Sequence, residues 1–294
     1  MFRTELLRPV PALLTQRAVQ SGDTVAFEDR LRAVDYRTLD ARTARLAGHL
    51  VAAGLRPGDH VVSCLGNRVE SIEATLAVTR AGGVGIPVSP NLDAGELRWL
   101  VEEHRPFAVF GTPVAAMEVR QSRWPQPPLL VVLPDDGATT APIPARCAYF
   151  EDLASTEPTA LPRDDYGIDD PAWVLYAART AARPTGVSAT QRSAVWSVLA
   201  CFERMFSGGG LHLLPVPLSY SYAHILCLLG VTALGGNARL AGFVPDEILY
   251  RAGGPDYTLI AGVDAPAKVC LTAGLAGGPA ELLRQAPLFN LLVP

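Results

Sequence analysis

The chain has 294 residues, of which 49% are hydrophobic and 18% are charged, a composition typical of a globular protein and not of a disordered one. The formal net charge of -4 provides no basic field for a phosphate backbone, so the sequence does not predict a nucleic-acid partner. No apolar run reaches the roughly 18 to 20 residues that a membrane span needs, and the N-terminal segment is too interrupted for a signal peptide.

The five cysteines lie mostly in apolar runs and lack the C-x-x-C spacing of a zinc site. They are Cys64, Cys147, Cys201, Cys227 and Cys270. Reduced, buried thiols suit this pattern better than a disulfide framework, and reduced thiols indicate a cytoplasmic protein. No motif of metal ligands or of paired catalytic carboxylates stands out, so we assign no metal ligand and no catalytic residue.

Helices and strands alternate through the first part of the chain. Apolar residues recur at helical spacing in three segments, and short apolar runs closed by glycine, asparagine or proline follow them. Helices are expected over 36–55, 69–81 and 96–103, and strands over 60–67, 82–90 and 107–111. Because such alternation builds a parallel sheet with helices on its faces, the sequence predicts an α/β fold.

A proline-rich, polar stretch over 121–171 surrounds one apolar strand, PLLVVLP, and is interpreted as a connecting region. Its acidic cluster is expected to be solvated, with a metal site as the alternative: Asp164, Asp165, Asp169 and Asp170. A second alternating pattern follows, with strand 173–177, turn 179–186, helix 189–206, strand 211–217, helix 223–234 and the short strands ARLA, TLIAGV and KVCLTAG. Two similar α/β subdomains are therefore predicted, residues 1–165 and residues 166–294.

Three stretches resemble, in order, the adenylate-forming superfamily of acyl-CoA synthetases, luciferases and nonribosomal peptide synthetase adenylation domains. They are DYRTLDARTARLAGHL, RAGGVGIPVSPNLDAGELRWLVEEHRP and LLPVPLSYSYAHILCLLGVTALGGNARL. The stretches are collinear and correctly spaced, and the resemblance covers nearly the whole chain. It implies the two α/β subdomains of the N-terminal domain of an AMP-dependent ligase, and an ancestry in acid-thiol ligation.

The phosphate loop of that family, Y-T-S-G-T-T-G-x-P-K-G-V, is matched here by YAARTAARPTGV. Both inner glycines are lost, the first of them to Arg179, and the lysine is replaced by Thr185, while Thr180 and Gly186 are retained. Such glycines turn backbone N–H groups toward phosphate oxygens and the lysine adds charge, so their loss weakens phosphate binding. We expect a relaxed loop; the alternative is a new anion site built on Arg179 and Arg183.

The final residues, APLFNLLVP, resemble the family segment N-x-Y-G-P-T-E, which lines the adenine and magnesium site. Asn290 matches, whereas Leu292 and Val293 replace the tyrosine and the glycine, and the Thr-Glu pair and the small lid domain are absent. ATP and Mg²⁺ binding are therefore expected to be lost or weak, in a naturally short chain. The apolar end LFNLLVP is expected to be covered by a second copy or by another protein.

The segment PLSYSYAHI resembles the region in which many relatives carry an aromatic or histidine gate to the acyl pocket. Tyr220, Tyr222 and His224 are accordingly candidate substrate-binding residues. The alternative is that both tyrosines pack in the core and that His224 is a hydrogen-bonded core or surface histidine. Gly277 and Gly278 resemble a family turn that contacts adenine, and they are a second candidate site for a planar ligand.

Three functions are compatible with these features. In the first, the chain has lost independent adenylation and handles an acyl or amino-acyl group, on a carrier protein or CoA, in a biosynthetic pathway. In the second, it is one half of a split ligase that a partner chain completes. In the third, it is a non-catalytic interaction scaffold. The expected assembly is a homodimer or a complex with another biosynthetic protein.

Overall fold

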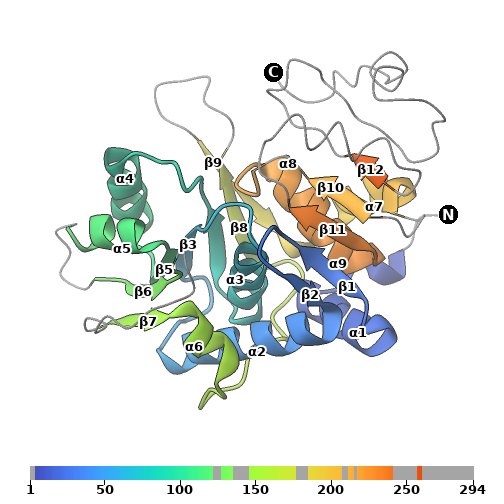
Figure 1. Ribbon diagram of the computed structural model, residues 1–294, viewed down its shortest axis with the longest axis horizontal. Coiled ribbons are helices and arrows are strands. Elements are labelled where there is room, and N and C mark those ends of the chain that lie inside the picture. Colours follow the sequence, from blue (N-terminus) through green and yellow to red (C-terminus); the bar gives the residue numbers. More distant parts are fainter. Residues whose placement is uncertain are drawn as a thin grey trace.

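The computed structural model describes residues 4–121, 127–134, 146–176, 185–206, 211–214, 217–240 and 257–259. At residues 4, 201–206, 211–214, 222, 226, 227 and 257–259 it describes the backbone only. The described residues form two β-sheets with helices packed around and between them (Figure 1). The predicted α/β fold with a parallel sheet is confirmed.

The larger sheet has seven strands among the described residues. In spatial order they are β7 (Cys147–Tyr149), β6 (Leu129–Val132), β5 (Ala108–Gly111), β3 (His60–Cys64), β4 (Val84–Pro87), β8 (Pro171–Tyr176) and β9 (Gly186–Thr190). All neighbours are parallel except β8 and β9, which are antiparallel. The central strands are almost entirely buried, as the faces of a parallel sheet covered by helices usually are.

The smaller sheet consists of β12 (Tyr257–Leu259), β10 (Leu211–Leu214), β11 (Asn237–Leu240), β1 (Val25–Glu28) and β2 (Ala33–Asp35). Only β1 and β2 pair antiparallel in it. Each sheet takes strands from both sides of residue 165, because β1 pairs with β11 and β4 pairs with β8. The two sheets therefore do not follow the predicted division at residue 165, which stays a prediction about domain organisation.

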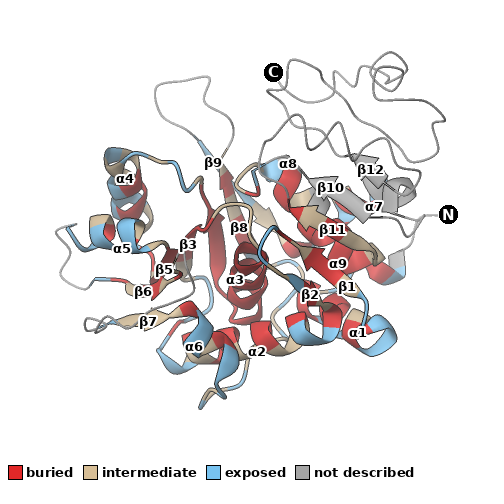
Figure 2. Ribbon diagram, in the orientation of Figure 1, coloured by how far each residue is buried: buried red, intermediate tan, exposed pale blue. Residues whose placement is uncertain are grey.

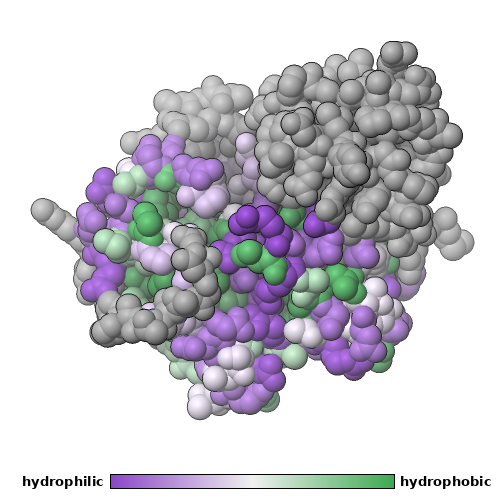
Figure 3. Space-filling model, in the orientation of Figure 1, coloured by the Kyte–Doolittle hydropathy of each residue, from purple (hydrophilic) through white to green (hydrophobic). Residues whose placement is uncertain are grey.

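Helices cover the sheets on several sides. They are η1 (Thr4–Leu6), α1 (Val10–Ser21), α2 (Tyr36–Ala52), α4 (Ala94–His104), α5 (Pro113–Arg120), α6 (Phe150–Ser155), α7 (Gln191–Phe206), α8 (Ser221–Ala223), η2 (His224–Leu229, a π-helix) and α9 (Gly230–Leu234). Side chains cap several of them: Asp35 accepts from Thr38 N–H at the start of α2, and Asp93 and Glu96 form a capping box at α4. Hydrophilic residues cover much of α1, α2 and α6 on the face shown in Figure 3.

Helix α3 (Val69–Arg80) lies between the two sheets, and all of its residues are buried (Figures 1 and 2). Ile72 and Leu76 on one side of it pack into the core beside the smaller sheet, whereas Ala77 and Val78 on the other side pack into the core beside β3 and β5. A helix that is buried on every side is a structural core element and has no solvent face. It therefore fixes the two sheets relative to one another.

The polar residues of α3 are buried in ion pairs. Glu73, which is fully buried, accepts hydrogen bonds from Arg42 at 2.7 Å and from Arg32 at 2.6 Å. Arg80, whose side chain is 5% exposed, donates to Asp164 at 2.6 Å and 2.8 Å and to Asp40 at 2.9 Å. Asp164, which was expected in a solvated linker, is 36% exposed, and its carboxylate also pairs with a buried guanidinium that would otherwise lose this partner.

Several elements differ from the expected ones. The predicted helix 189–206 begins at Gln191, because residues 186–190 form β9, and the connecting region contains β7 and α6 as well as the predicted strand. The expected helix over 223–234 is a short α-helix, a π-helix and a second α-helix in succession. The predicted strand KVCLTAG and the apolar end LFNLLVP lie outside the described residues.

The segment that follows α6 packs against α2 through a helical glycine. A Cβ on Gly48 would lie 2.4 Å from the Ala160 carbonyl oxygen and 2.4 Å from Pro158 Cγ. Although alanine favours a helix, we expect Gly48→Ala to be destabilising by about 1–3 kcal/mol through overpacking. Urea unfolding measures the change. Gly95→Ala in α4 is the matched control, because its Cβ meets only the Asp93 side chain, and equal stability of the two variants would contradict this packing.

Candidate functional site

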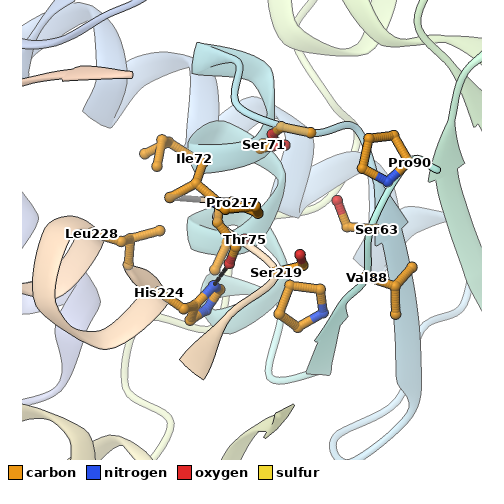
Figure 4. Close-up of a pocket in the computed structure, with 13 residues that line it drawn as sticks. Ser63, Ser71, Ile72, Thr75, Val88, Pro90, Pro217, Ser219, His224 and Leu228 are labelled. Atoms are coloured by element: carbon orange, nitrogen blue, oxygen red, sulfur yellow. Dashed lines mark hydrogen bonds between the residues drawn. The ribbon is translucent and has the colours of Figure 1, made fainter. Parts of the chain in front are cut away.

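A cleft lies where the carboxyl ends of β3 and β4 meet α3 and the chain that leads into η2 (Figure 4). Its volume is about 350 Å³, with the open mouth included. One wall comes from the first part of the chain: Ser63, Gly66, Ser71, Ile72, Thr75, Pro87, Val88 and Pro90. The other wall is Pro217, Leu218, Ser219, His224 and Leu228. The carboxyl ends of parallel strands are a common place for ligands, so this cleft is the candidate site.

Hydrogen bonds at the rim hold the two walls in register. The Leu218 N–H donates to Asn67 Oδ1 at 2.8 Å, although the two residues are far apart in sequence. Gly66 has a φ of +74°, which suits glycine, and this turn brings the Gly66 carbonyl within 2.6 Å of the Ser71 hydroxyl that donates to it. The loop after β3 is thus tied both to α3 and to the opposite wall.

His224 is the first residue of η2, and only 1% of it is exposed. Its Nδ1 lies 3.3 Å from the Leu218 carbonyl oxygen, and its ring packs edge-on against Trp173 of β8 with centroids 5.7 Å apart. Because a carbonyl oxygen can only accept, we assign the ring proton to Nδ1. Nε2 then carries a lone pair, and this buried nitrogen has no hydrogen-bond partner among the described residues.

The electrostatics of His224 follow from its burial. Desolvation lowers the pKa of this histidine to about 4, and the hydrogen bond to the Leu218 carbonyl raises it only in part. The ring is therefore neutral at pH 7. A group with so low a pKa is a weak base at neutral pH, so Nε2 is suited to accepting a hydrogen bond and poorly suited to removing a proton.

Three hydroxyl groups line the cleft besides the Ser71 hydroxyl that bonds to Gly66. Ser63 stands at the end of β3, Thr75 lies one turn beyond Ser71 on α3, and Ser219 lies on the opposite wall. None of these three hydroxyls forms a hydrogen bond with another described residue. The rest of the lining is mostly apolar, and in Figure 4 Ser63 and Val88 lie on one side while His224 and Leu228 lie on the other.

The described residues that line the cleft include no acidic or basic side chain other than the neutral His224. The nearby N-terminus of α3 does not supply positive potential freely either, because Asp29 accepts a hydrogen bond from the Val69 N–H at 2.8 Å. Asp29 is itself 8% exposed, and Glu70 occupies the first turn. The described part of the lining is therefore neutral at pH 7.

The structure brings one of the three predicted acyl-site residues into the cleft, and it is His224. Tyr220 is half-buried, precedes α8 and packs against the core beside the smaller sheet, so its role in binding stays a prediction. Tyr222 lies in α8, and its side chain is outside the described part. His224 is a hydrogen-bonded core histidine, as the alternative stated, and it lines the cleft, while its role in substrate binding stays a prediction.

Of the five residues singled out in the altered phosphate loop, the structure describes Thr185 and Gly186, and both are exposed. Gly186 begins β9, and a Cβ there would lie 2.6 Å from Val174 Cγ1 in β8. This retained glycine is thus required by strand packing. Arg179, Thr180 and Arg183 lie outside the described residues, as do Gly277 and Gly278.

Sequence reasoning missed Ser63, Thr75 and Ser219. Ser63 is the one polar residue between the buried residues of β3, and a hydroxyl at the carboxyl end of a parallel strand is the signal that could have found it. Thr75 lies within an apolar helix and carried no such signal. Its place in the cleft depends on the packing of α3 against the second part of the chain.

The described residues contain no cluster of three or more histidine, cysteine or acidic side chains that could hold a metal ion. None of their helices combines the length and the apolar character required to cross a membrane. Two cysteines are free in this part of the chain: Cys64 is buried and Cys147 is half-buried. Burial raises the pKa of the Cys64 thiol to about 12, so at neutral pH this thiol is protonated and inert.

This α/β architecture matches the fold of the N-terminal domain of adenylate-forming ligases. The chain belongs to the AMP-binding enzyme family, whose model matches residues 14–251. A benzoate CoA ligase from Burkholderia xenovorans LB400 has a similar fold, with a TM-score of 0.69 and 20% identity over 84% of this chain and 48% of that chain.

Curated relatives match along most of the chain. Naringenin synthase of Pestalotiopsis fici is 31% identical over 285 residues, which are 92% of this chain and 10% of that protein. Feruloyl-CoA synthase of an Amycolatopsis species is 28% identical over 251 residues, which are 84% of this chain and 47% of the relative. The chain thus spans about a tenth of the first relative and about half of the second.

Proposed function

We propose that this chain binds an acyl or amino-acyl group and does not form an adenylate on its own. The observation that carries the proposal is the composition of the loop between β8 and β9, in which both inner glycines and the lysine of the family pattern are replaced. The cleft between the ends of β3 and β4 and the start of η2, whose described lining carries no charged side chain, supports binding of an uncharged group. The names of a benzoate CoA ligase and a feruloyl-CoA synthase among the similar proteins favour an aromatic acid as the source of that group.

The donors that remain in the loop do not suit a triphosphate. A charge-assisted hydrogen bond contributes about 1.5–3 kcal/mol and a neutral one about 1 kcal/mol, so the loss of several lowers phosphate affinity by orders of magnitude. Thr185 stands in place of the lysine, and Gly186 is explained by packing against Val174. We therefore derive no step through ATP or Mg²⁺, and the proposal includes no cofactor.

The proposal also covers the carrier of the acyl group, the assembly of the protein and its location in the cell. The acyl group would be carried by CoA or by a carrier protein of the same biosynthetic pathway, a proposal that the names of a feruloyl-CoA synthase and a nonribosomal peptide synthetase among the relatives favour. We further propose that the protein forms a homodimer or a complex with another biosynthetic protein, and that it is cytoplasmic. The alternative of a split ligase differs in one respect, which is that a partner chain would restore adenylation.

Titration calorimetry with ATP, together with ATP–pyrophosphate exchange in the presence of aromatic acids, tests the proposal. We expect no saturable ATP binding below millimolar concentration and no exchange. The matched variant restores the loop with Arg179→Gly, Ala182→Gly and Thr185→Lys, and it is expected to bind ATP more tightly than the wild type. Micromolar ATP binding by the wild type would contradict the proposal, and exchange that appears only with a partner chain would favour the split ligase.

A further inference from the structure

Outside the cleft, three side chains from three elements form a row of hydrogen bonds. They are His60, the first residue of β3, His104, the last residue of α4, and Tyr176, the last residue of β8. The Nδ1 atoms of His60 and His104 lie 3.2 Å apart, and His104 Nε2 is hydrogen-bonded to the Tyr176 hydroxyl. All three residues are half-buried, and the rings of both neighbouring pairs meet edge-on. His104 therefore connects the start of β3 with the end of β8.

The protons of this row are coupled, because a hydrogen bond between two ring nitrogens needs one N–H and one lone pair. If His60 donates, His104 carries its proton on Nε2 and donates to Tyr176; if His104 donates, its Nε2 accepts the Tyr176 proton. One charged ring is also compatible with the row, since a protonated His104 donates at both nitrogens. Two charged rings are not, because both Nδ1 atoms then carry hydrogen and the two cations repel each other.

The surroundings of His104 keep its ring neutral at pH 7.5. Burial and, after it, His60 lower the pKa of His104, and Glu103 raises it only in part. Helix α5 also packs against α4, but its basic residue, Arg120, lies beside Cys147. Among the described residues, His60 and Glu103 are thus the groups whose charge acts on this ring.

Tyr176 is anchored by His104. Its hydroxyl has no other hydrogen bond to a described residue, and its ring meets Trp99 of α4 edge-on, with centroids 6.1 Å apart. Burial and, after it, Glu103 raise the pKa of this phenol, so it keeps its proton at and below neutral pH. In the sheet Tyr176 pairs with Gly186 of β9, and the altered part of the phosphate loop lies between these two residues in the sequence.

We propose that His60 and His104 form a pH-sensitive tether, which holds Tyr176 at the end of β8 while at most one ring is charged and releases it when both are. Repulsion between two imidazolium rings turns His104 away from His60, and the bond to the Tyr176 hydroxyl is lost with that position. The last pair of the β8–β9 ladder then loosens at the base of the altered loop. The tether acts on the strand and needs no bound acyl group, so it is independent of the proposed function.

Hydrogen exchange of the backbone amides of β8 and β9 at pH 7.5 and pH 5 tests the tether. After correction for the intrinsic pH dependence of exchange, residues 174–176 and 186–188 of the wild type should be about five- to tenfold less protected at pH 5, as the loss of one hydrogen bond allows. The amides of β5 are the internal reference, because global unfolding would expose them as well, and their protection should be unchanged.

His60→Asn keeps a hydrogen-bonding group beside His104 but cannot take up a proton, so protection should be the same at both pH values. Tyr176→Phe removes the anchored hydroxyl and should show the lower protection already at pH 7.5. His49→Asn is the matched control. This histidine of α2 contacts Thr156 and belongs to neither strand, so the variant should keep the pH response of the wild type.

The ring ¹⁵N resonances of the wild type keep the test valid if His60→Asn does not fold. The two rings should take up protons in separate steps, and the loss of protection should accompany the second step. The tether would be overturned by equal protection of the wild type at both pH values, by a pH response that persists in His60→Asn, or by protonation of both rings in one step or without loss of protection. ATP binding by the wild type would overturn the proposed function and leave the tether standing.

Discussion

Replacing Glu73 with alanine is expected to lower the free energy of unfolding by about 3–5 kcal/mol, because it leaves two arginines without the carboxylate that they share. Glu73 is fully buried in the middle of α3, and its two oxygens accept hydrogen bonds from Arg42 of α2 and from Arg32 after β1. The Arg42 side chain is 11% exposed, so water can replace the lost partner only in part.

The rest of the network limits the loss. Arg42 also donates to Glu151 of α6, and Arg32 also donates to Glu70, so each guanidinium keeps one carboxylate when Glu73 is removed. The effect nonetheless falls on the contact between α2 and α3, which is among the most extensive in the fold. Removing Glu73 therefore loosens the packing of the helix that lies between the two sheets.

Urea unfolding of Glu73→Ala at pH 7 measures this loss, with Glu157→Ala as the control. Glu157 is 77% exposed and pairs with Arg45, so its removal should cost no more than about 1 kcal/mol. A Glu73→Ala variant as stable as Glu157→Ala would show that the buried network makes no net contribution to the fold, and it would contradict the structural role assigned to α3.

The sequence predicted α3 as a helix but not its surroundings. Its apolar residues recur at helical spacing, with glutamates and an arginine between them. The structure buries these charged residues, and the partners of Glu73 and Arg80 come from α2 and from a proline-rich segment more than 80 residues further along the chain. Local periodicity contains no information about such distant charges.

The strands show the same limit of prediction from local sequence patterns. Central strands such as β3 and β5 were predicted within about three residues, because apolar runs bounded by turn residues determine them locally. Strand β9 was missed because GVSAT has no apolar run, and it becomes a strand only by pairing with β8. The pairing of β1 with β11 joins segments about 200 residues apart, so the composition of both sheets was beyond local reasoning.

The candidate site was predicted in one half only. The family resemblance led to the segment that contains His224, whereas Ser63 and Thr75 come from the first part of the chain and carry no ligand motif of their own. The aromatic residue chosen as a gate, Tyr220, packs against the core, and the histidine four residues later lines the cleft. One turn of π-helix at His224 alters which side chains share a face, and no periodic pattern predicts it.

Stability should fall as the pH is lowered from about 6.5 toward 4, and His224 should account for a large part of the loss. Burial lowers the pKa of His224 in the folded protein to about 4, whereas an exposed histidine in the unfolded chain has a pKa of 6.5. Above pH 6.5 both states are neutral at this residue, and its contribution to stability is fully present. Between pH 6.5 and 4 only the unfolded chain takes up the proton, so unfolding becomes more favourable.

The size of this effect follows from the separation of the two pKa values. Each unit is worth about 1.4 kcal/mol, so the loss attributable to His224 is on the order of 2–3 kcal/mol at pH 4.5. The measurement is urea unfolding of the wild type, His224→Phe and His224→Gln from pH 7.5 to pH 4.5. Neither variant can take up the proton, so the wild type should lose stability more steeply than both, by a similar amount. Parallel curves for all three proteins would mean that His224 is not held neutral in the folded state, and the lone pair assigned to Nε2 would then be wrong.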